Sequence, residues 1–329
     1  MANADIVNNR NSWTFIAWAP YSRRSEVFAK SFKGKLHCIH YLRFQRPLYA
    51  PPKYVLQAIR TLQVLFSEHP QAVHVQNPPV ICGLVVSFYC FITGARFVFD
   101  HHSAAFGHKW DWLLPLQKLL ARRAVTNIVT TQYWAEIVRS WGAHALIMGD
   151  PFLELPPGEG FPIEPRFNIV YVSTFAPDEP LDAVLEAATY LPQIHVYITG
   201  DTKRKTKSFH DSLPTNVTCT GFLPDAKYIG LLRAADAIMV LTTRDHTLQL
   251  GGCEAVAIGQ PLLTSDWPFL REFFSLGTVH VDNTSDGIRD GILIMMKEHA
   301  RLKSEVPVLR AEKRREWSLQ SAQLNELVF

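Results

Sequence analysis

The sequence of 329 residues has no apolar run long enough to span a membrane. A spanning helix needs about 20 apolar residues, and the most apolar stretch, residues 80–92, has only the length of a buried core helix. The first residues, MANADIVNNRNS, lack the basic and then apolar pattern of a signal peptide. We therefore expect a soluble, cytoplasmic protein.

Cysteine is scarce, and like charges form no long block. The five cysteines are odd in number and include no Cys-x-x-Cys pair, which argues against a disulfide framework and a zinc site. The net charge is +3, and the densest basic cluster is Lys203, Arg204, Lys205 and Lys207. Without a basic stripe we expect no nucleic-acid binding, and only a weak preference for a small anionic ligand or a membrane surface.

Several motifs with known chemistry are also absent. The sequence has no Gly-x-Gly-x-x-Gly, no P-loop and no Gly-x-Ser-x-Gly. It has no Asp-x-Asp either, so we expect no carboxylate-bound metal and no resident cofactor. Positive charge at an anion site would then come from side chains and helix ends.

The sequence does have a regular alternation of short apolar runs and helix-length amphipathic segments. Near-continuous apolar strands that alternate with helices predict a parallel sheet covered on both faces. The predicted strands are residues 13–19, 36–42, 72–76, 96–100, 127–131, 168–173, 194–200, 216–222, 237–243, 261–265 and 278–281. The predicted helices are residues 53–66, 110–124, 132–141, 181–190, 225–235 and 304–327.

A proline-rich segment divides this alternation. PFLELPPGEGFPIEPRF, residues 151–167, holds five prolines, which fix φ and remove backbone donors, so it predicts a linker. We expect an N-terminal domain over 1–150, a linker over 151–166, a C-terminal domain over 167–303 and a helix over 304–329 that packs back on the first domain. The predicted fold class is α/β, with two Rossmann-like, doubly wound domains facing across a cleft.

Ligands of open α/β sheets bind at the carboxyl ends of the strands, and TTRDHTLQLGGCEAVAIGQPLLTSD follows such a strand. A helix that begins near Gly251 and Gly252 would offer unpaired N–H groups to an anion such as a diphosphate. Glu254 would accept hydrogen bonds from ribose hydroxyls, unless it merely caps the helix and the glycines only form a turn. Arg244 would contact phosphate and His246 a sugar hydroxyl, unless both lie in an ordinary exposed loop.

Two stretches of the first half also follow strands. His101 and His102 end the strand RFVFD, where one of them would bond a sugar hydroxyl or a phosphate, or would lie satisfied in the wall of the cleft. A candidate site for an anionic acceptor or a phosphate opens the helix after the first strand; the alternative is a set of solvated side chains. It comprises Tyr21, Ser22, Arg23 and Arg24.

The segment from Trp110 to Arg123 has an aromatic start, leucines at helical spacing and a basic end. Such a helix either lies on an anionic membrane surface or faces the core of the protein. Peripheral membrane contact is therefore one of the partners to test.

Three stretches of the second half, taken in order, carry a family resemblance. VYVSTFAPDEPLDAVLEAATYLPQIHVYITGD, NVTCTGFLPDAKYIGLLRAADAIMVLTT and GGCEAVAIGQPLLTSD resemble the C-terminal domain of GT-B glycosyltransferases, above all the retaining group 1, or family four, enzymes. The likeness covers most of residues 167–290. The first half is similar to the family's N-terminal domain more weakly, through FVFDHHSAAF.

The resemblance implies roles for individual residues. Glu254 matches the second glutamate of the family's Glu-x7-Glu motif, which binds the donor ribose, and the backbone of Gly251 and Gly252 would meet the diphosphate and the sugar. His102, or in its place His101, matches the family's sugar-facing histidine. The loop that holds the nucleotide base is matched by Gly221, Phe222, Leu223 and Pro224.

The chain departs from the family's pattern at the sites of charged residues. His246 stands where the first motif glutamate is expected. Thr174 and Glu179 stand where the family has an arginine and a lysine that bind the diphosphate. The candidate replacements for these cations are Arg244, Lys203, Lys205, Arg23 and Arg24.

Together these features predict a metal-independent glycosyltransferase. It would move a sugar from a nucleotide-diphosphate sugar, bound by the C-terminal domain, to a saccharide or lipid-linked acceptor on the N-terminal domain, in polysaccharide or glycolipid synthesis. His102 or His101 and Arg244 would stabilise charge on the departing diphosphate, and His246 would orient the sugar. Retention of configuration follows from the resemblance alone. Two other interpretations stay open: a nucleotide-sugar epimerase on the same fold, and a non-catalytic nucleotide-sugar binder.

Overall fold

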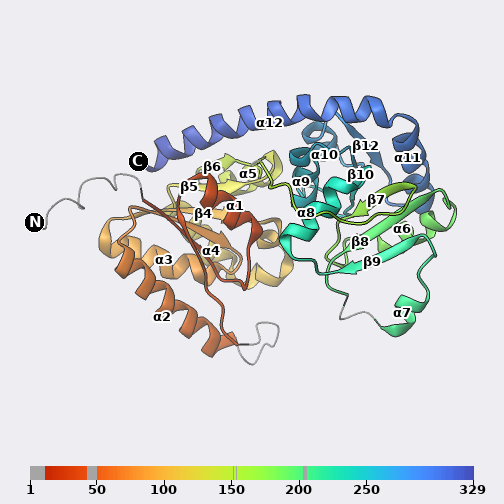
Figure 1. Ribbon diagram of the computed structural model, residues 1–329. Coiled ribbons are helices and arrows are strands. Elements are labelled where there is room, and N and C mark those ends of the chain that lie inside the picture. The colour runs from red at the N-terminus through yellow and green to blue at the C-terminus, as the bar shows by residue number, and fades with distance from the viewer. Residues whose placement is uncertain (1–11, 43–49, 151, 153, 203–205) are drawn as a thin grey trace, which may run out of the picture. The chain divides into compact units, whose positions relative to one another are not determined.

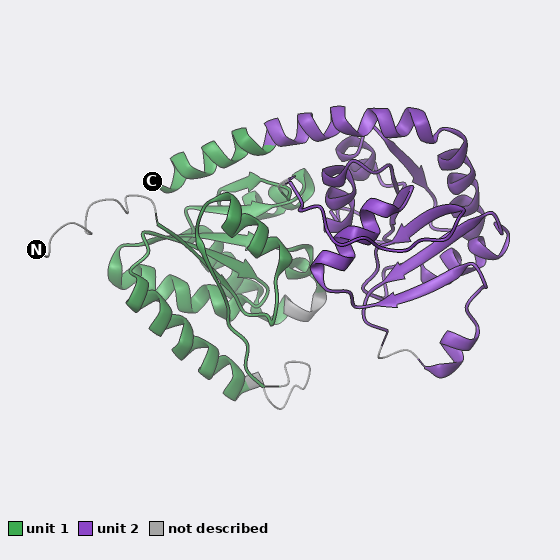
Figure 2. Ribbon diagram, in the orientation of Figure 1, with its two compact units in different colours: residues 1–151, 317–329 green, residues 152–316 purple. Residues whose placement is uncertain are grey.

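The computed structural model of the protein describes residues 12–42, 50–150, 152, 154–202 and 206–329. The chain divides into two units: Met1–Pro151 with Trp317–Phe329 form unit 1, and Phe152–Glu316 form unit 2 (Figure 2). Each unit is built on one parallel sheet of six strands with helices packed against it (Figure 1). The predicted α/β class with two doubly wound sheets is confirmed.

The sheet of unit 1 has the strand order β2-β1-β3-β4-β5-β6. Its strands are β1 (Trp13–Ala17), β2 (Lys35–Cys38), β3 (Ala72–Asn77), β4 (Arg96–His101), β5 (Thr126–Val129) and β6 (Ala145–Ile147). Its helices are α1 (Arg23–Ser31), α2 (Ala50–Glu68), α3 (Val80–Thr93), α4 (Leu114–Arg123) and α5 (Gln132–Ser140), with the 3₁₀ helices η2 (Ser103–Phe106) and η3 (His108–Leu113).

Side chains that alternate along these strands divide the core of unit 1 into two layers. On β4, Phe97 and Phe99 pack with α2, α3 and α4, whereas Val98 packs with α1. Asp100 has the same parity as Val98, and His74 on β3 contacts the ring of Phe28 on α1. The α1 side of the sheet therefore receives polar side chains, which include Gln76, bonded to Ser25 on α1.

The sheet of unit 2 has the order β12-β11-β10-β7-β8-β9, which is the strand order of the Rossmann fold. Its strands are β7 (Phe167–Tyr171), β8 (Ile194–Thr199), β9 (Val217–Gly221), β10 (Ala237–Val240), β11 (Leu262–Ser265) and β12 (Thr278–Val281). Its helices are α6 (Leu181–Thr189), α7 (Lys207–Asp211), α8 (Asp225–Ala234), α9 (Leu250–Ile258), α10 (Pro268–Phe273) and α11 (Ser285–Lys297).

The last helix, α12 (His299–Val328), contributes to the cores of both units. Leu302 and Leu309 are buried in the core of unit 2, and Leu324 and Val328 are buried in the core of unit 1. Its periodic apolar positions thus serve three hydrophobic clusters, two in unit 2 and one in unit 1.

Several elements differ from the sequence prediction, which included neither β6 nor the helices α7, α10 and α11. Ala145–Ile147 forms β6, which was not predicted because a run of three residues is too short to show a period. The expected helix over 110–124 consists of η3 and then α4, because Pro115 begins a new helix in its first turn. In the described ranges, no helix has both the length and the apolar content needed to cross a membrane.

Gly230 on α8 allows the linker to pass close to this helix. A Cβ at this position would overlap the carbonyl oxygen of Glu159. We predict that Gly230→Ala lowers the free energy of unfolding by about 1–3 kcal/mol, although alanine is the better helix former. Urea unfolding followed by circular dichroism measures the change.

Gly160→Ala is the matched control, because a Cβ there would have no heavy atom within 4 Å. We expect it to leave the urea midpoint unchanged. A Gly230→Ala protein as stable as the parent would show that the linker does not pack on α8.

Candidate functional site

The carboxyl ends of the strands carry the candidate residues of both units. In unit 1 the strand order reverses between β1 and β3, and Tyr21–Arg24 follow β1. In unit 2 the reversal lies between β7 and β10, whose loops carry Thr174 and Arg244. These switch points are where ligands of doubly wound sheets bind.

A buried ionic cluster lies on the α1 side of the sheet in unit 1. Nε and Nη2 of Arg24 donate to the two oxygens of Asp100, each at 3.0 Å, and Nη1 donates to Asp150 Oδ1 at 2.5 Å. Nη2 also donates to the carbonyl of Met148 at 3.1 Å. Arg24, Asp100 and Asp150 are at most 9% exposed. Arg24 thus bridges two buried carboxylates, which is a different task from the phosphate contact expected of it.

The cluster controls protonation around Asp100. Burial works to raise the pKa of Asp100, but Arg24, with His102 and His74, holds that pKa well below its usual range. Nε2 of His74 lies 3.7 Å from Asp100 Oδ2. Burial is nevertheless the largest influence on this histidine and lowers the pKa of His74 to about 4. Asp100 is therefore an anion and His74 is neutral at pH 7.

His101 is held on both ring nitrogens by neighbouring amides. Its Nε2 lies 2.9 Å from Asn127 Oδ1, and its Nδ1 lies 2.9 Å from Asn77 Nδ2. Because Asn127 donates its Nδ2 to two carbonyls, its oxygen is the acceptor, so His101 carries its proton on Nε2. Burial lowers the pKa of His101 to about 4. His101 is therefore enclosed by its neighbours and neutral at pH 7.

His102 keeps an exposed edge. Its backbone N–H donates to the carbonyl of Asn77 at 2.9 Å, and its side chain is 27% exposed. Its Nε2 is enclosed, 3.5 Å from Asp100 Oδ2. The Nε2 side of the ring therefore faces the Asp100 carboxylate, and the rest of the side chain is part-exposed.

The other candidate residues of unit 1 form a local network at the start of α1. Ser22 is the N-cap, and its Oγ accepts a bond from the backbone N–H of Ser25. Tyr21 Oη and Arg23 Nη1 both donate to Glu26 Oε2, at 3.0 and 3.3 Å. The exposed phenol of Tyr21 and the part-exposed Arg23 thus share one carboxylate.

In unit 2, Glu179 closes the loop that follows β7. Its Oε2 accepts a bond from Ser173 Oγ at 2.6 Å, and its Oε1 accepts bonds from Thr174 N and Oγ1 at 3.0 and 2.9 Å. The backbone N–H of Ala176 donates to Oε2 at 3.2 Å. Glu179 therefore organises its own loop. The resemblance implies a diphosphate-binding lysine at this position, where the chain has a carboxylate.

The loop after β7 is tied to the loop after β10. Thr242 Oγ1 donates to Asp178 Oδ2 at 3.0 Å, and the N–H of Thr243 donates to the carbonyl of Asp178 at 2.7 Å. Arg244 follows directly and its side chain is exposed. These bonds fix the backbone on which Arg244 is presented at the switch point.

Both of these loops contain a residue other than glycine in the left-handed region. Phe175 has a φ of 58° and His246 a φ of 54°. Such conformations cost on the order of 1–3 kcal/mol and cluster at functional sites. At His246 the backbone N–H donates to Asp245 Oδ1 at 2.6 Å, and the ring Nε2 lies 3.5 Å from Asp245 Oδ2. Asp245 thus fixes both the backbone and the ring of His246.

The glycine pair at the start of α9 serves packing. A Cβ on Gly251 would lie 2.9 Å from Val172 Cγ1, and one on Gly252 would lie 2.8 Å from Phe274 Cζ. The two glycines let α9 lie close to β7 and α10. The sequence suggested that these glycines make space for an anion. The contacts show instead that they make space for the side chains of Val172 and Phe274.

Glu254 is the fifth residue of α9, beyond its first turn, and is 8% exposed. Its Oε2 accepts a 2.7 Å bond from the phenol of Tyr228 on α8. Pro224 is the N-cap of α8, so this tyrosine stands one turn beyond the predicted base loop. The carboxylate and the loop are therefore coupled through one side chain.

The predicted base loop follows β9. Gly221 has a φ of 70°, Phe222 is 77% exposed, and Leu223 packs on the core that contains α8 and α9. An exposed aromatic ring beside a part-buried leucine is a suitable stacking surface for a base. Lys203 and Lys205 lie outside the described residues.

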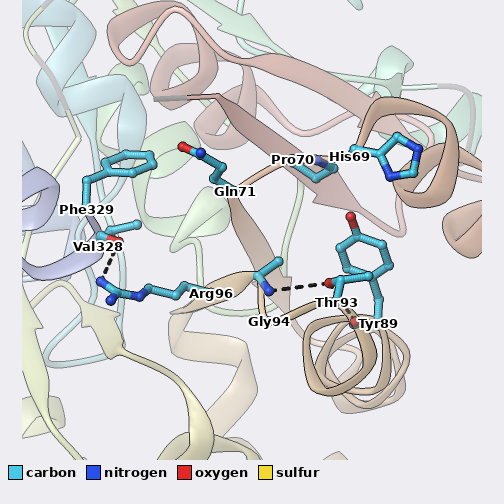
Figure 3. Close-up of a pocket in the computed structure, with 10 residues that line it drawn as sticks. His69, Pro70, Gln71, Tyr89, Thr93, Gly94, Arg96, Val328 and Phe329 are labelled. Carbon is cyan, nitrogen blue, oxygen red and sulfur yellow. Dashed lines mark hydrogen bonds between the residues drawn. The ribbon is translucent and has the colours of Figure 1, made fainter. Parts of the chain in front are cut away.

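A pocket of about 410 Å³ lies at the opposite edge of the sheet in unit 1 (Figure 3). Gln71 precedes β3 and Arg96 begins β4, so the pocket adjoins the amino ends of the strands. Arg96 Nη1 already donates to the carbonyl of Val328 at 2.9 Å. In the described part of the chain, no group of three His, Cys, Asp or Glu side chains could hold a metal ion.

Comparisons with known proteins agree with this arrangement. Residues 166–303 match the family described as Glycosyl transferases group 1. Residues 166–303 are a group 1 glycosyltransferase domain. The two units together have the GT-B fold. No curated protein matches the sequence.

The fold of the chain is similar to that of several solved structures. HepE from Anabaena, solved with UDP-glucose, is 13% identical with a TM-score of 0.71, over 96% of this chain and 99% of that chain. Sucrose-phosphate synthase from Thermosynechococcus elongatus is 13% identical with a TM-score of 0.68, over 97% and 98%. A glycosyltransferase from Rickettsia africae is 9% identical with a TM-score of 0.66, over 98% of each chain.

Sequence reasoning missed three residues that organise the site. Tyr228 and Asp178 lie in the group 1 domain, and Asp100 lies in unit 1. Tyr228 stands four residues after Pro224, a spacing that places it on the first turn of a helix beside the loop. Asp178 and Asp100 gave no such signal, because their partners are 64 and 76 residues away.

His74 makes the stability of unit 1 sensitive to acid. A histidine of pKa 6.5 in the unfolded chain, with a folded pKa of about 4, binds its proton first in the unfolded state. Its contribution is complete above pH 6.5 and is lost as the pH falls toward 4. His74→Phe should reduce the decline of the unfolding free energy over this window by up to about 1 kcal/mol per pH unit.

Urea unfolding at a series of pH values tests this prediction. Phenylalanine suits the site, because His74 already packs among aromatic rings. The centroid of its ring lies 4.8 Å from that of Phe15 and 5.4 Å from that of Phe28. His210→Asn, at an exposed position on α7, is the control and should keep the parent's slope. Equal slopes for the parent and His74→Phe would contradict the prediction.

Proposed function

We propose that the protein is a glycosyltransferase that moves a sugar from a nucleotide-diphosphate sugar to an acceptor. The observation that carries the proposal is the position of Glu254 in a group 1 domain, at the carboxyl edge of a sheet with Rossmann order. HepE, which shares the fold, was solved with UDP-glucose, so this donor is the first to test. The acceptor would be a saccharide or a lipid-linked sugar.

The donor would be held by the loops of the group 1 domain. Glu254 would accept bonds from the ribose hydroxyls, Phe222 would stack on the base, and the first turn of α9 would face the diphosphate. Because Glu179 has replaced a cation, Arg244 supplies positive charge at the switch point. Metal-independent binding is proposed on these grounds and on the absence of Asp-x-Asp from the sequence.

The chemistry would depend on charge at the leaving group. As the bond between the sugar C1 and the diphosphate oxygen breaks, its electron pair stays on the diphosphate. A new bond forms between C1 and the oxygen of an acceptor hydroxyl, whose proton passes to the departing diphosphate. Arg244 would stabilise the growing negative charge. The part-exposed side of His102, positioned by Asp100, would contact the sugar, and His246 would orient it. Retention of configuration belongs to the proposal.

A panel of nucleotide sugars distinguishes three activities. Release of nucleotide supports transfer, an isomerised sugar without nucleotide release supports an epimerase, and a thermal shift without turnover supports a non-catalytic binder. The last alternative is motivated by the fixed anion at Glu179. A nucleotide at 100 times its Kd should stabilise the protein by about 2.7 kcal/mol, which identifies the base.

Glu254→Gln tests the donor site. We expect the Kd for the preferred nucleotide sugar to rise about 10- to 100-fold, since a hydrogen bond to a charged group contributes about 1.5–3 kcal/mol. Tyr228→Phe should have a smaller effect, because it removes only the bond that orients the carboxylate.

Isothermal titration calorimetry measures both variants. Glu186→Gln, at an exposed position on α6, is the control and should bind as the parent does. An unchanged Kd in Glu254→Gln would remove this residue from the donor site.

His102→Ala tests the role of unit 1 in catalysis. We expect kcat to fall by about 100-fold or more, while the Kd for the nucleotide stays constant, because the histidine contacts the sugar only. Steady-state transfer assays and calorimetry separate the two effects. His144→Ala, at an exposed position just before β6, should keep full activity; an active His102→Ala would exclude the histidine from the reaction.

A further inference from the structure

The buried side of helix α2 carries a row of polar side chains that have no part in the proposed function. Lys53, Gln57 and Thr61 follow one another at intervals of four residues, so they lie on one side of the helix. Their exposed fractions are 8%, 2% and 0%, respectively. Val64 and Leu65, farther along the same helix, pack into the core of unit 1. The polar row therefore faces inward, where apolar side chains are expected.

The polar row lies beside the carboxyl ends of β1 and β2. Trp18 directly follows β1, and its Nε1 donates to Thr61 Oγ1 at 2.9 Å. Ile39 directly follows β2, and its carbonyl accepts a 2.7 Å bond from Gln57 Nε2. The ring of Tyr54 on α2 stacks on the ring of Trp18, with the centroids 5.8 Å apart. These contacts attach α2 to the edge of the sheet at which ligands of doubly wound domains bind.

Hydrogen bonding in the row becomes incomplete toward the start of α2. Thr61 is bonded, but the Oε1 atom of Gln57 is enclosed and has no hydrogen-bond partner. One turn earlier, the side chain of Lys53 has no ion pair or hydrogen bond within the described part of the chain, and its Nζ lies 4.6 Å from the centroid of the Tyr54 ring. Buried polar groups in folded proteins are normally paired, so this end of the row lacks a partner.

Two other cations at this edge of unit 1 are already neutralised. Arg24 bridges two buried carboxylates, and Arg23 is paired with Glu26. Lys53 differs from both, because no carboxylate accompanies it. Burial also lowers the pKa of Lys53. An anion bound beside the ammonium would stabilise its charged form and offset the cost of burial.

A phosphate group supplies what both side chains lack. Its oxygens accept bonds from the Lys53 ammonium, which binds phosphate as a point charge. Gln57 Oε1 needs a donor, and a hydroxyl of the phosphate or of an attached sugar provides one. Pro51 and Pro52 in the first turn of α2 have no backbone N–H, so Lys53 is the main source of positive charge there. We propose that Lys53 and Gln57 bind a phosphate group of the acceptor, which is then a sugar phosphate.

The proposal deepens the proposed function and rests on it for the assignment to an acceptor. The phosphate site itself rests on side chains of unit 1 alone. The part-buried ring of Tyr54, stacked on Trp18, offers an apolar surface to the sugar that the phosphate would carry. The site therefore combines an anion subsite with an aromatic surface at one edge of the sheet.

Isothermal titration calorimetry with inorganic phosphate tests the site in the full chain. Lys53→Met should raise the Kd for phosphate at least about tenfold, because it removes the charged donor. Sulfate has no hydroxyl at neutral pH and should bind the parent about 5- to 100-fold more weakly than phosphate, since Gln57 Oε1 would stay unpaired. Gln57→Glu keeps Lys53 and should also weaken phosphate binding at least about tenfold, because its carboxylate repels the anion.

Lys297→Met, at an exposed position on α11, is the control and should bind phosphate as the parent does. Urea unfolding should show Lys53→Met to be at least as stable as the parent, because an unpaired buried charge is costly. A parent that binds no phosphate would overturn the proposal. So would an unchanged Kd for phosphate in Lys53→Met, or equal affinity of the parent for sulfate and phosphate.

Titration with UDP-glucose separates this proposal from the proposed function. Its Kd should be the same in the parent and in Lys53→Met, whereas a weaker binding in the variant would place Lys53 in the donor site and overturn the proposal. Phosphate binding that depends on Lys53, in a protein that binds no nucleotide sugar, would confirm the phosphate site and remove its assignment to an acceptor.

Discussion

A parallel sheet covered on both faces accepts polar side chains only where they are paired or where the strands end. This constraint determines where chemistry can occur in both units. In unit 1 it produces the pairing of Arg24 with Asp100 and Asp150 inside the α1 layer. In unit 2 β10 is apolar, and β7 holds one buried amide, Asn168, which is bonded to the carbonyls of Glu164 and Arg166. Hydroxyls, carboxylates and Arg244 begin where these strands stop.

The ionic cluster connects the interior of unit 1 to its surface. Two carboxylates share one guanidinium, and the remaining face of Asp100 lies beside His74 and His102. His74 is buried and neutral, whereas His102 has one edge outside. The same carboxylate therefore stabilises the fold through Arg24 and orients the histidine proposed to contact the sugar. A residue with two such tasks tolerates little change, since a buried charge left unpaired is costly.

In unit 2 a carboxylate organises the switch point where the resemblance implied cations. Glu179 accepts bonds from Ser173, Thr174 and Ala176, while Asp178 fastens the neighbouring loop. Left-handed backbone at Phe175 and His246 accompanies this arrangement. In the described loops after β7 and β10 the one lysine or arginine is Arg244, so a diphosphate bound there would depend more on backbone N–H groups than the family pattern implies.

The sequence was sufficient for the periodic and local features. Alternation of apolar runs and helices gave both sheets, and the turn before α8 and the helix of Glu254 were recognisable from short stretches. Among the strands only β6 was too short to be detected, and the helices α7, α10 and α11 were not predicted. The tertiary structure decided which polar residues face outward. Arg24 meets partners 76 and 126 residues away, and His101 is enclosed by Asn77 and Asn127, whereas its neighbour His102 keeps an exposed edge. The reason is physical: a strand fixes the side to which a residue points, but the burial and charge of that residue depend on segments that only folding brings to it.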